Sequence, residues 1–172
     1  KVLAANPLVV ATADNGAADR RYPPLRGSKS SIHEGGHRVP FLARWPEKIP
    51  AATVSHETIC HVDFMATLAA LLDAKLPPNA AEDSFNLLPI LRGEKPVRPV
   101  REATVHHSFS GRFAIRQGGW VLIEQGTGDD NRAAAAEPAW RKKERGDTPD
   151  ESKGQLYNLR ADPAQKTNLY AA

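Results

Sequence analysis

The fold is decided by residues 8–16, which read LVVATADNG. The first six are apolar or β-branched without strict alternation, which is typical of a short strand buried on both faces. Asp14, Asn15 and Gly16 then form a turn signal. Because such a strand needs neighbours in a sheet and residues 1–7 offer none, we expect its partners to lie upstream in a longer parent chain.

Length and composition narrow the class of protein. The chain has 172 residues, of which 41% are hydrophobic and 25% charged, as in ordinary globular proteins. A single cysteine, Cys60, excludes an internal disulfide and a cysteine-built zinc site. The 23 basic and 20 acidic residues are scattered, which does not indicate a nucleic-acid partner. No apolar run approaches the roughly 20 residues of a membrane span, and residues 1–7 do not look like a signal peptide.

The next part of the chain predicts mixed α and β structure. Residues 17–36 form a long loop rich in glycine, serine and basic residues, a kind of segment that is usually functional or disordered. A second apolar strand is expected over 39–46. Apolar residues at near-helical spacing predict a helix over 57–73, and a helical turn over 86–91 ends at Gly93.

After Pro99 the pattern changes to short strands joined by tight turns, which indicates an antiparallel sheet. The strands are expected over 103–106, 113–116, 120–123 and 155–159. We therefore divide the chain into an α/β part, residues 1–93, and an antiparallel part, residues 94–172. The second part carries a polar insertion near 126–153 that we expect to be mobile.

Asp14 and Asn15 are candidate metal ligands. They follow a strand, and ligands bind at the carboxyl ends of strands in open α/β sheets. A carboxylate beside an amide carbonyl offers two hard oxygens, which suit Ca²⁺ or Mg²⁺ better than zinc. Asp-Asn-Gly is also a common turn with its own side-chain to backbone bonds, and that alternative stays open.

Lys29 is a candidate anion-binding residue. It lies in a glycine and serine loop, residues 25–31, where a lysine can hold an anionic oxygen as a compact point charge. The glycine spacing of a phosphate-binding P-loop is absent. A solvated loop lysine is the alternative interpretation.

The segment after Lys29 contains two histidines and an ion-pair candidate. Glu34 and Arg38 flank a pair of glycines and can pair across them, which we interpret as a structural contact. His33 and His37 are four residues apart, but the glycines between them argue against the helix that a His-x-x-x-His metal site needs.

The remaining polar candidates carry weaker signals. His61 and Asp63 lie on the apolar predicted helix, where a hydrogen-bonded core histidine is expected rather than a metal ligand. Cys60 lies on the same apolar face and is expected to behave as a small buried hydrophobe. His106 and His107 end a predicted strand, where they either contact a polar substrate or face solvent.

Several of these segments together resemble the C-terminal half of the formylglycine-dependent sulfatases, the arylsulfatase type. The segments are LVVATADNG at 8–16, LRGSK at 25–29, EGGHRVP at 34–40 and RWP at 44–46. The likeness continues, in order, through 61–68, 87–91, 113–116, 156–159, 162–163 and 168–169. It covers nearly the whole chain.

The resemblance implies a fold and a set of roles. The fold is α/β, the C-terminal part of an alkaline-phosphatase-like α/β domain followed by a small antiparallel sheet subdomain. Asp14 and Asn15 match the family's calcium ligands, and Lys29 matches the lysine that contacts the sulfate. Ca²⁺, with Mg²⁺ as the alternative, and a formylglycine nucleophile are the implied cofactors. His107 is added as a candidate for substrate contact, and a periplasmic or secreted protein is expected.

One departure defines what this chain lacks. The family makes its nucleophile from a cysteine in a Cys-x-Pro/Ala-x-Arg signature, whereas Cys60 is followed by His61-Val62-Asp63-Phe64. We therefore expect the formylglycine in the N-terminal part of the parent and an isolated chain without activity. The resemblance implies no catalytic role for His33 or His37. His33 stands where an aromatic residue is commoner in the family, and His37 stands at a variable position of the motif.

Three functions remain in view at this point. The first is sulfate ester hydrolysis by the parent protein, on aryl or carbohydrate sulfates, with the remainder of the sulfatase domain as partner. The second is hydrolysis of a phosphate or phosphonate ester on the same scaffold. The third is a non-catalytic lobe that binds a sulfated glycan.

Overall fold

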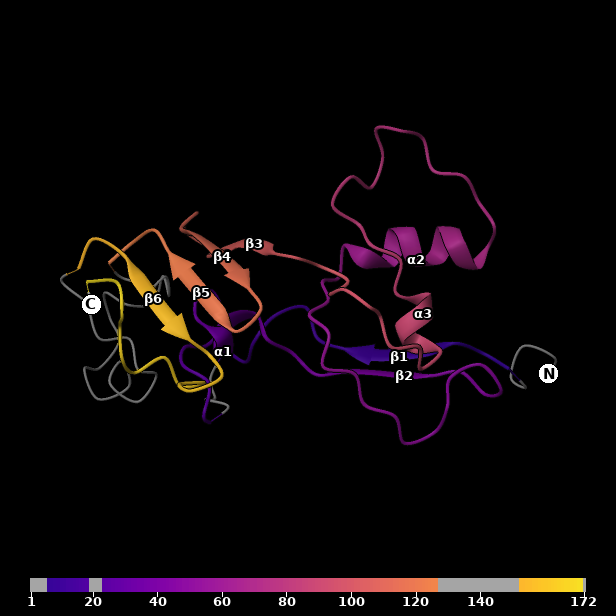
Figure 1. Ribbon diagram of the computed structural model, residues 1–172, viewed down its shortest axis with the longest axis horizontal. Helices are drawn as coiled ribbons and strands as arrows, with labels where there is room; N and C mark the ends of the chain where they lie inside the picture. The colour runs from indigo at the N-terminus through magenta and orange to yellow at the C-terminus, as the bar shows by residue number, and fades with distance from the viewer. Residues whose placement is uncertain (1–5, 19–22, 127–151, 172) are drawn as a thin grey trace. The chain divides into compact units, whose positions relative to one another are not determined.

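The computed structural model describes residues 6–18, 23–126 and 152–171 (Figure 1). Backbone contacts divide the chain into two compact units. The first unit combines residues 1–11 with 41–102, and the second combines residues 12–40 with 103–172. We describe each unit by itself.

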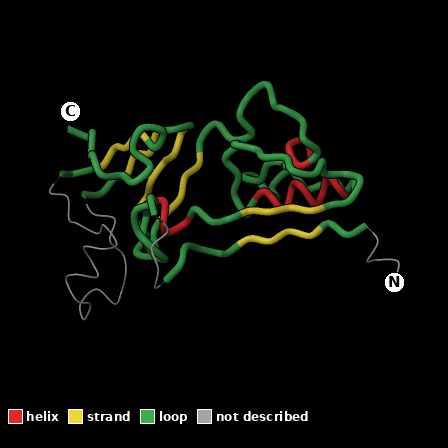
Figure 2. Tube along the Cα trace, turned by 90° about the horizontal axis from the view of Figure 1, so that it is seen from below, coloured by secondary structure: helices red, strands yellow, loops and turns green. Residues whose placement is uncertain are grey.

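The first unit contains most of the α/β part of the sequence, whose residues 12–40 belong to the second unit. Strands β1 (Val9–Thr12) and β2 (Phe41–Arg44) pair in a two-stranded sheet and lie side by side in Figure 2. Two helices follow, α2 (Asp63–Leu71) and α3 (Leu88–Leu91), which contact each other. Both predicted strands are therefore confirmed, each shorter than expected.

The expectation that β1 is buried on both faces is wrong for the described structure. Val9 is 49% exposed, and three of the four residues of the strand are exposed. The physical reason is that β2 is the only neighbour of β1 in its sheet over the described ranges, so the apolar side chains lack covering layers there.

The helix predicted over 57–73 begins later, at Asp63. The backbone N–H of Cys60 donates to the Asp63 carboxylate at 2.8 Å, in the turn just before the helix. Beyond Leu71 the chain reaches Asp73, whose φ of 51° is left-handed and incompatible with a continuing helix. Cys60 itself is half-buried rather than fully buried.

Asp63 organises a buried polar cluster in this unit. Its side chain is fully buried and accepts two hydrogen bonds from the Arg101 guanidinium, at 2.6 and 3.1 Å. It also accepts the backbone N–H of Phe85 at 2.9 Å, and the Arg101 guanidinium lies over the Phe85 ring at 4.7 Å. The hydrogen bond with Asp63 is the main cause that raises the pKa of Arg101, against the opposing effect of burial. The core histidine expected at His61 is wrong: His61 is exposed, because it lies in the turn before α2, and Asp63 is the buried polar residue instead.

The second unit is built on an antiparallel sheet of four strands in the order β3-β4-β5-β6. The strands are β3 (Thr104–His107), β4 (Phe113–Gln117), β5 (Trp120–Ile123) and β6 (Gln155–Asn158). Each pairs with its neighbour along the chain, so the predicted meander is confirmed to within a residue or two.

The register of this sheet places alternate residues in one core. Ala114 lies opposite Ile123, and Val121 lies opposite Tyr157. These four side chains are almost fully buried and form a cluster with Ile32 and Leu159. Ile32 comes from the long loop, so the loop contributes directly to the core of the sheet. Most of the insertion expected near 126–153, residues 127–151, lies outside the described residues.

The long loop over 17–36 contains an element that we did not expect. A single helical turn, α1 (Glu34–His37), forms in spite of its two glycines. It is stable because Glu34, Gly35 and Gly36 are buried and the N–H of Arg38 closes the turn on the carbonyl of Glu34 at 2.8 Å. Tertiary packing outweighs the low helix propensity of glycine here.

None of the helices in the described parts of the chain has the length and apolar character needed to cross a membrane.

Candidate functional site

The candidate metal ligands and the candidate anion-binding lysine are brought together by backbone hydrogen bonds. The turn that carries Asp14 and Asn15 continues into Gly16, whose N–H donates to the carbonyl of Gly36 at 2.8 Å. The N–H of Lys29 donates to the carbonyl of Ala17 at 3.0 Å. The Asp14 turn, the Lys29 loop and α1 therefore lie against one another in the second unit.

Glycines make this close approach possible. A Cβ atom on Gly16 would lie 1.8 Å from the carbonyl oxygen of Gly35. A Cβ atom on Gly35 would in turn lie 2.4 Å from the carbonyl oxygen of Gly27. Both contacts are with backbone, which cannot swing away, so only glycine fits at these positions.

The side chains of the candidate site all have access to solvent. Asp14 and Lys29 are exposed and Asn15 is half-buried. One Asp14 carboxylate oxygen accepts the backbone N–H of Asn15 at 3.0 Å, the bond expected of an Asx-type turn. The hydrogen bond expected for an Asp-Asn-Gly turn is thus present. The exposed Asp14 carboxylate still has lone pairs available to bind a cation.

The donor set fits a hard cation only in part. Carboxylate and amide oxygens are suitable ligands for Ca²⁺, which takes six to eight of them. Within the ranges that the structure describes, no three His, Cys, Asp or Glu side chains gather where they could hold a metal ion. Asp14 and Asn15 would therefore supply two ligands to a site whose other ligands come from elsewhere.

The two histidines at the end of β3 lie in different environments. His107 is exposed, its Nδ1 donates to the carbonyl of Ser108 at 2.8 Å, and its ring lies 5.8 Å from that of Phe113. The turn that follows is tied to the residue after Lys29, because the N–H of Phe109 donates to the carbonyl of Ser30 at 3.1 Å. His107 thus ends the strand whose following turn is hydrogen-bonded to the Lys29 loop.

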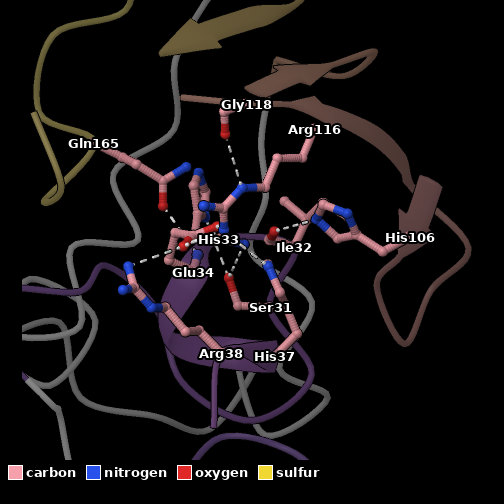
Figure 3. Close-up of polar contacts among 10 residues, drawn as sticks. All are labelled: Ser31, Ile32, His33, Glu34, His37, Arg38, His106, Arg116, Gly118 and Gln165. Atoms are coloured by element: carbon pink, nitrogen blue, oxygen red, sulfur yellow. Dashed lines mark hydrogen bonds and ion pairs between the residues drawn. The ribbon is translucent and has the colours of Figure 1, made fainter. Parts of the chain in front are cut away.

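His106 faces the interior instead. Its Nε2 contacts the carbonyl oxygen of Ile32 at 3.3 Å, and its ring packs on the ring of His37 with centroids 4.2 Å apart (Figure 3). Burial, with a smaller effect from the charge of His37, lowers the pKa of His106 to about 4. We interpret His106 as a packing residue.

Glu34 is the buried acid of this unit. Its side chain is 1% exposed, and one carboxylate oxygen lies 3.2 Å from the Arg116 guanidinium on β4. His37 and Arg38 approach the carboxylate at 3.4 and 3.5 Å (Figure 3). The expected pairing with Arg38 is confirmed, but Arg38 is 55% exposed and shares Glu34 with a better-buried partner.

The charge of Glu34 is maintained by these neighbours. Burial alone would raise the pKa of the carboxyl group. The hydrogen bond from His37 and the positive charges around Glu34 outweigh that effect and hold its pKa below the ordinary value. Glu34 is therefore an anion with three basic partners, and sequence reasoning had assigned it only one of them.

His33 and Gln155 connect the long loop to β6. His33 is fully buried and its Nε2 donates to the Gln155 side-chain oxygen at 3.0 Å, while its Nδ1 accepts from the Ser31 hydroxyl at 3.2 Å. Tyr157 donates to the same Gln155 oxygen at 2.6 Å. Arg26 donates to the Tyr157 hydroxyl at 2.9 Å. His33 and His37 are thus held by different partners. The expectation that the glycines between them prevent a helix is wrong, because buried packing stabilises α1 over Glu34–His37.

The burial of His33 leads to a prediction about pH. Burial, then the charge of Arg26, lowers the pKa of His33 to about 3, so the folded protein holds it neutral. In the unfolded chain its pKa is about 6.5. Below pH 6.5 the unfolded state therefore takes up the proton first, and stability that is present above that pH is lost as the pH falls toward 3.

Replacing His33 with glutamine removes this source of acid sensitivity. We expect the difference in urea midpoint between pH 7 and pH 5 to be smaller in H33Q than in the natural protein, even if H33Q is less stable at pH 7. The matched control is His56→Gln, because His56 is exposed. An H33Q variant with the same pH dependence as the natural protein would contradict the prediction.

Known proteins match this chain over most of its length. The family model described as Sulfatase matches residues 3–74. An N-acetylgalactosamine-6-O-sulfatase of Bacteroides thetaiotaomicron is 34% identical over 95% of this chain and 33% of its own length. Human arylsulfatase A is also 34% identical, over 94% of this chain and 33% of its own length.

Solved structures match over the same extent. A Bacteroides thetaiotaomicron structure described under the metabolism of multiple glycosaminoglycans superposes with a TM-score of 0.72 at 34% identity, over 94% of this chain and 34% of that one. A sulfatase from Pseudoalteromonas sp. superposes with a TM-score of 0.70 at 21% identity, over 94% of this chain and 32% of that one, and so shares the fold.

Fold and comparisons together define an α/β protein of the alkaline-phosphatase-like class with a small antiparallel sheet. Within that class, the chain belongs to the sulfatase family. It spans about a third of the length of the curated relatives it matches.

Proposed function

We propose that the protein containing this chain hydrolyses sulfate esters, and that this chain supplies one wall of the sulfate site. The observation that carries the proposal is the backbone pairing of the Lys29 loop with the segment after Asp14 and Asn15. Two oxygen ligands for a cation and one lysine ammonium group thereby come from the same small region.

The chemistry follows from these charges. A sulfate group spreads negative charge over its oxygens, and fixed positive charge opposite those oxygens stabilises the transition state of transfer. The Lys29 ammonium group supplies one such charge and holds an oxygen of the ester. Asp14 and Asn15 would hold Ca²⁺, which supplies further positive charge when bound. These roles rest on the sulfatase motif together with the geometry.

The remaining parts of the reaction are assigned to the rest of the parent protein. There we place the nucleophile, a formylglycine, and the other ligands of the cation. Cys60 lies outside this chemistry, because it stands three residues before α2 in the first unit and is not followed by the nucleophile signature of the family. We also propose the boundary at residue 93 between the α/β part and the antiparallel subdomain.

The proposed substrate is a sulfated carbohydrate. Support comes from a relative named N-acetylgalactosamine-6-O-sulfatase, which aligns over 95% of this chain. His107 is the proposed contact with the sugar, since it is exposed at the end of β3, two residues before the turn that pairs with Ser30. A carbohydrate substrate of this kind is consistent with a periplasmic or secreted enzyme, which is the localisation that we propose.

The experiment that tests this function is an assay of the full-length parent on an aryl sulfate, with the variants Lys29→Ala and Asp14→Ala. K29A is expected to lower kcat/KM by about 100-fold, because a fixed charge opposite the transferring group is lost. D14A is expected to raise the Ca²⁺ concentration needed for half-maximal activity. Lys166→Ala serves as the matched control, since Lys166 is exposed in the same unit.

Each outcome decides the assignment. Unchanged activity in K29A and an unchanged Ca²⁺ requirement in D14A would overturn the proposed site. The same assay on an aryl phosphate tests the related hydrolysis of phosphate esters. Faster turnover of the phosphate than of the sulfate would replace the proposed substrate class.

A further inference from the structure

The buried carboxylate of Glu34 links the antiparallel sheet to the candidate site. Arg116 on β4 contacts both oxygens of Glu34, at 3.2 and 3.4 Å, and its Nε donates to the carbonyl of Gly118 at 3.3 Å (Figure 3). The backbone N–H of Glu34 donates to the Gln165 side-chain oxygen at 2.9 Å. The sheet subdomain therefore holds Glu34 at its side chain and at its main chain.

The position of Glu34 determines the position of the residues that follow it. Gly35 donates its N–H to the carbonyl of Arg26 at 2.7 Å, at the start of the Lys29 loop. Gly36 accepts the N–H of Gly16, two residues after Asp14. Any shift of Glu34 therefore moves the main-chain contacts on which both Lys29 and the Asp14 turn rest.

The packing around these glycines leaves no space for a side chain. A Cβ atom on Gly36 would lie 2.1 Å from the carbonyl oxygen of Ser31, and one on Gly35 would lie 2.6 Å from that of Arg26. Segments this close transmit a displacement rather than absorb it, because interiors are close-packed and little compressible. The other basic neighbours of Glu34 cannot provide this link, since His37 and Arg38 belong to α1 and its end and move with it.

We infer that Arg116 is a positioning residue for the sulfate site: through Glu34 it sets the location of the Lys29 ammonium group. Gln165 assists by fixing the Glu34 amide. The antiparallel subdomain thereby acts in sulfate binding although none of these side chains touches the sulfate. This inference rests on the proposed role of Lys29, and the experiment below separates the two.

The test is a double-mutant cycle in the full-length parent with an aryl sulfate as substrate and inorganic sulfate as competitive inhibitor. Arg116→Met alone is expected to lower kcat/KM about tenfold and to weaken inhibition by sulfate, because small misplacements of a binding group are costly. In the K29A background, R116M is expected to have no further effect on either quantity, since its effect passes through Lys29. R116K, which keeps the charge near Glu34, is expected to restore part of the activity.

A merely structural role of Arg116 predicts a different result. R116M would then lower kcat/KM by the same factor with and without Lys29, and that additivity would overturn the inference while leaving the proposed function intact. If K29A alone had no effect, the site assignment and the inference would both fail. Arg160→Met is the matched control: Arg160 is exposed in the same unit, and its substitution is expected to leave both quantities unchanged. Circular dichroism of each variant confirms that the compared proteins are folded.

Discussion

Asp63→Asn is expected to lower the free energy of unfolding by about 3 to 5 kcal/mol, because it leaves the buried guanidinium of Arg101 without its counter-charge. Asp63 is fully buried and the Arg101 side chain is 7% exposed, so water cannot replace the lost partner. The same carboxylate also satisfies the backbone amides of Cys60 and Phe85. An asparagine can accept through only one of its two terminal atoms, so at least one of these bonds is lost.

The measurement is urea denaturation of the parent protein and of the variants D63N, R101M and the double variant. Because each single change leaves a buried charge unpaired, the double variant is expected to be less destabilised than the sum of the single ones. Asp73→Asn is the control, since Asp73 is exposed. If D63N were as stable as D73N, the buried pair would not be a determinant of stability.

Gly36→Ala is expected to abolish most of the activity of the parent and to cost about 3 kcal/mol of stability, because the added methyl group has no room. Its Cβ atom would lie 2.1 Å from the carbonyl oxygen of Ser31 and 2.8 Å from that of Ser28, which are both backbone atoms. Relief requires α1 to move away from the loop that carries Lys29. G36A is therefore expected to displace the Lys29 loop by a steric clash, whereas R116M is expected to displace it by removing a charge.

The measurement combines kcat/KM on an aryl sulfate with the thermal midpoint of unfolding. Gly111→Asn is the matched control in the same unit. A Cβ atom at Gly111 would have no neighbour within 4 Å, and asparagine tolerates the left-handed φ of 79° found there. Retention of full activity by G36A would show that the Lys29 loop is not held as tightly as its contacts indicate.

The sheet of the second unit could be predicted from the sequence because its strands follow one another along the chain. Neighbouring short runs with turns between them pair locally. The pattern did not predict which face is buried, because Phe113 and Ile115 are 51% and 41% exposed whereas Ala114 between them is buried. The sulfatase motifs likewise identified Asp14, Asn15 and Lys29 as a set. The role of each remains a proposal that the assays above test.

The contacts between distant segments could not be predicted in this way. Glu34 was expected to pair with Arg38, four residues away, whereas Arg116 is 82 residues away along the chain. Asp63 was placed on the apolar predicted helix, but its partner Arg101 lies 38 residues further on. Sequence spacing reports neighbours on one helix or strand, and these pairs are made between separate elements.

The burial of β1 was overestimated for a related reason. An apolar strand signals that both faces are to be covered, but it does not say which segments cover them. In the described structure only β2 pairs with it, and Val9 and Leu42 are 49% and 63% exposed.

By itself, the run of residues 8–16 determined that a short strand ends in an Asp-Asn-Gly turn, because apolar β-branched residues and turn formers act locally. The sequence also determined the family, through motifs in a shared order. Only the tertiary structure decided that this turn lies against the Lys29 loop, and that Glu34 and Arg116 hold the arrangement. The physical reason is that these contacts depend on close backbone packing at glycines and on the pairing of buried charges across elements, which no local pattern encodes.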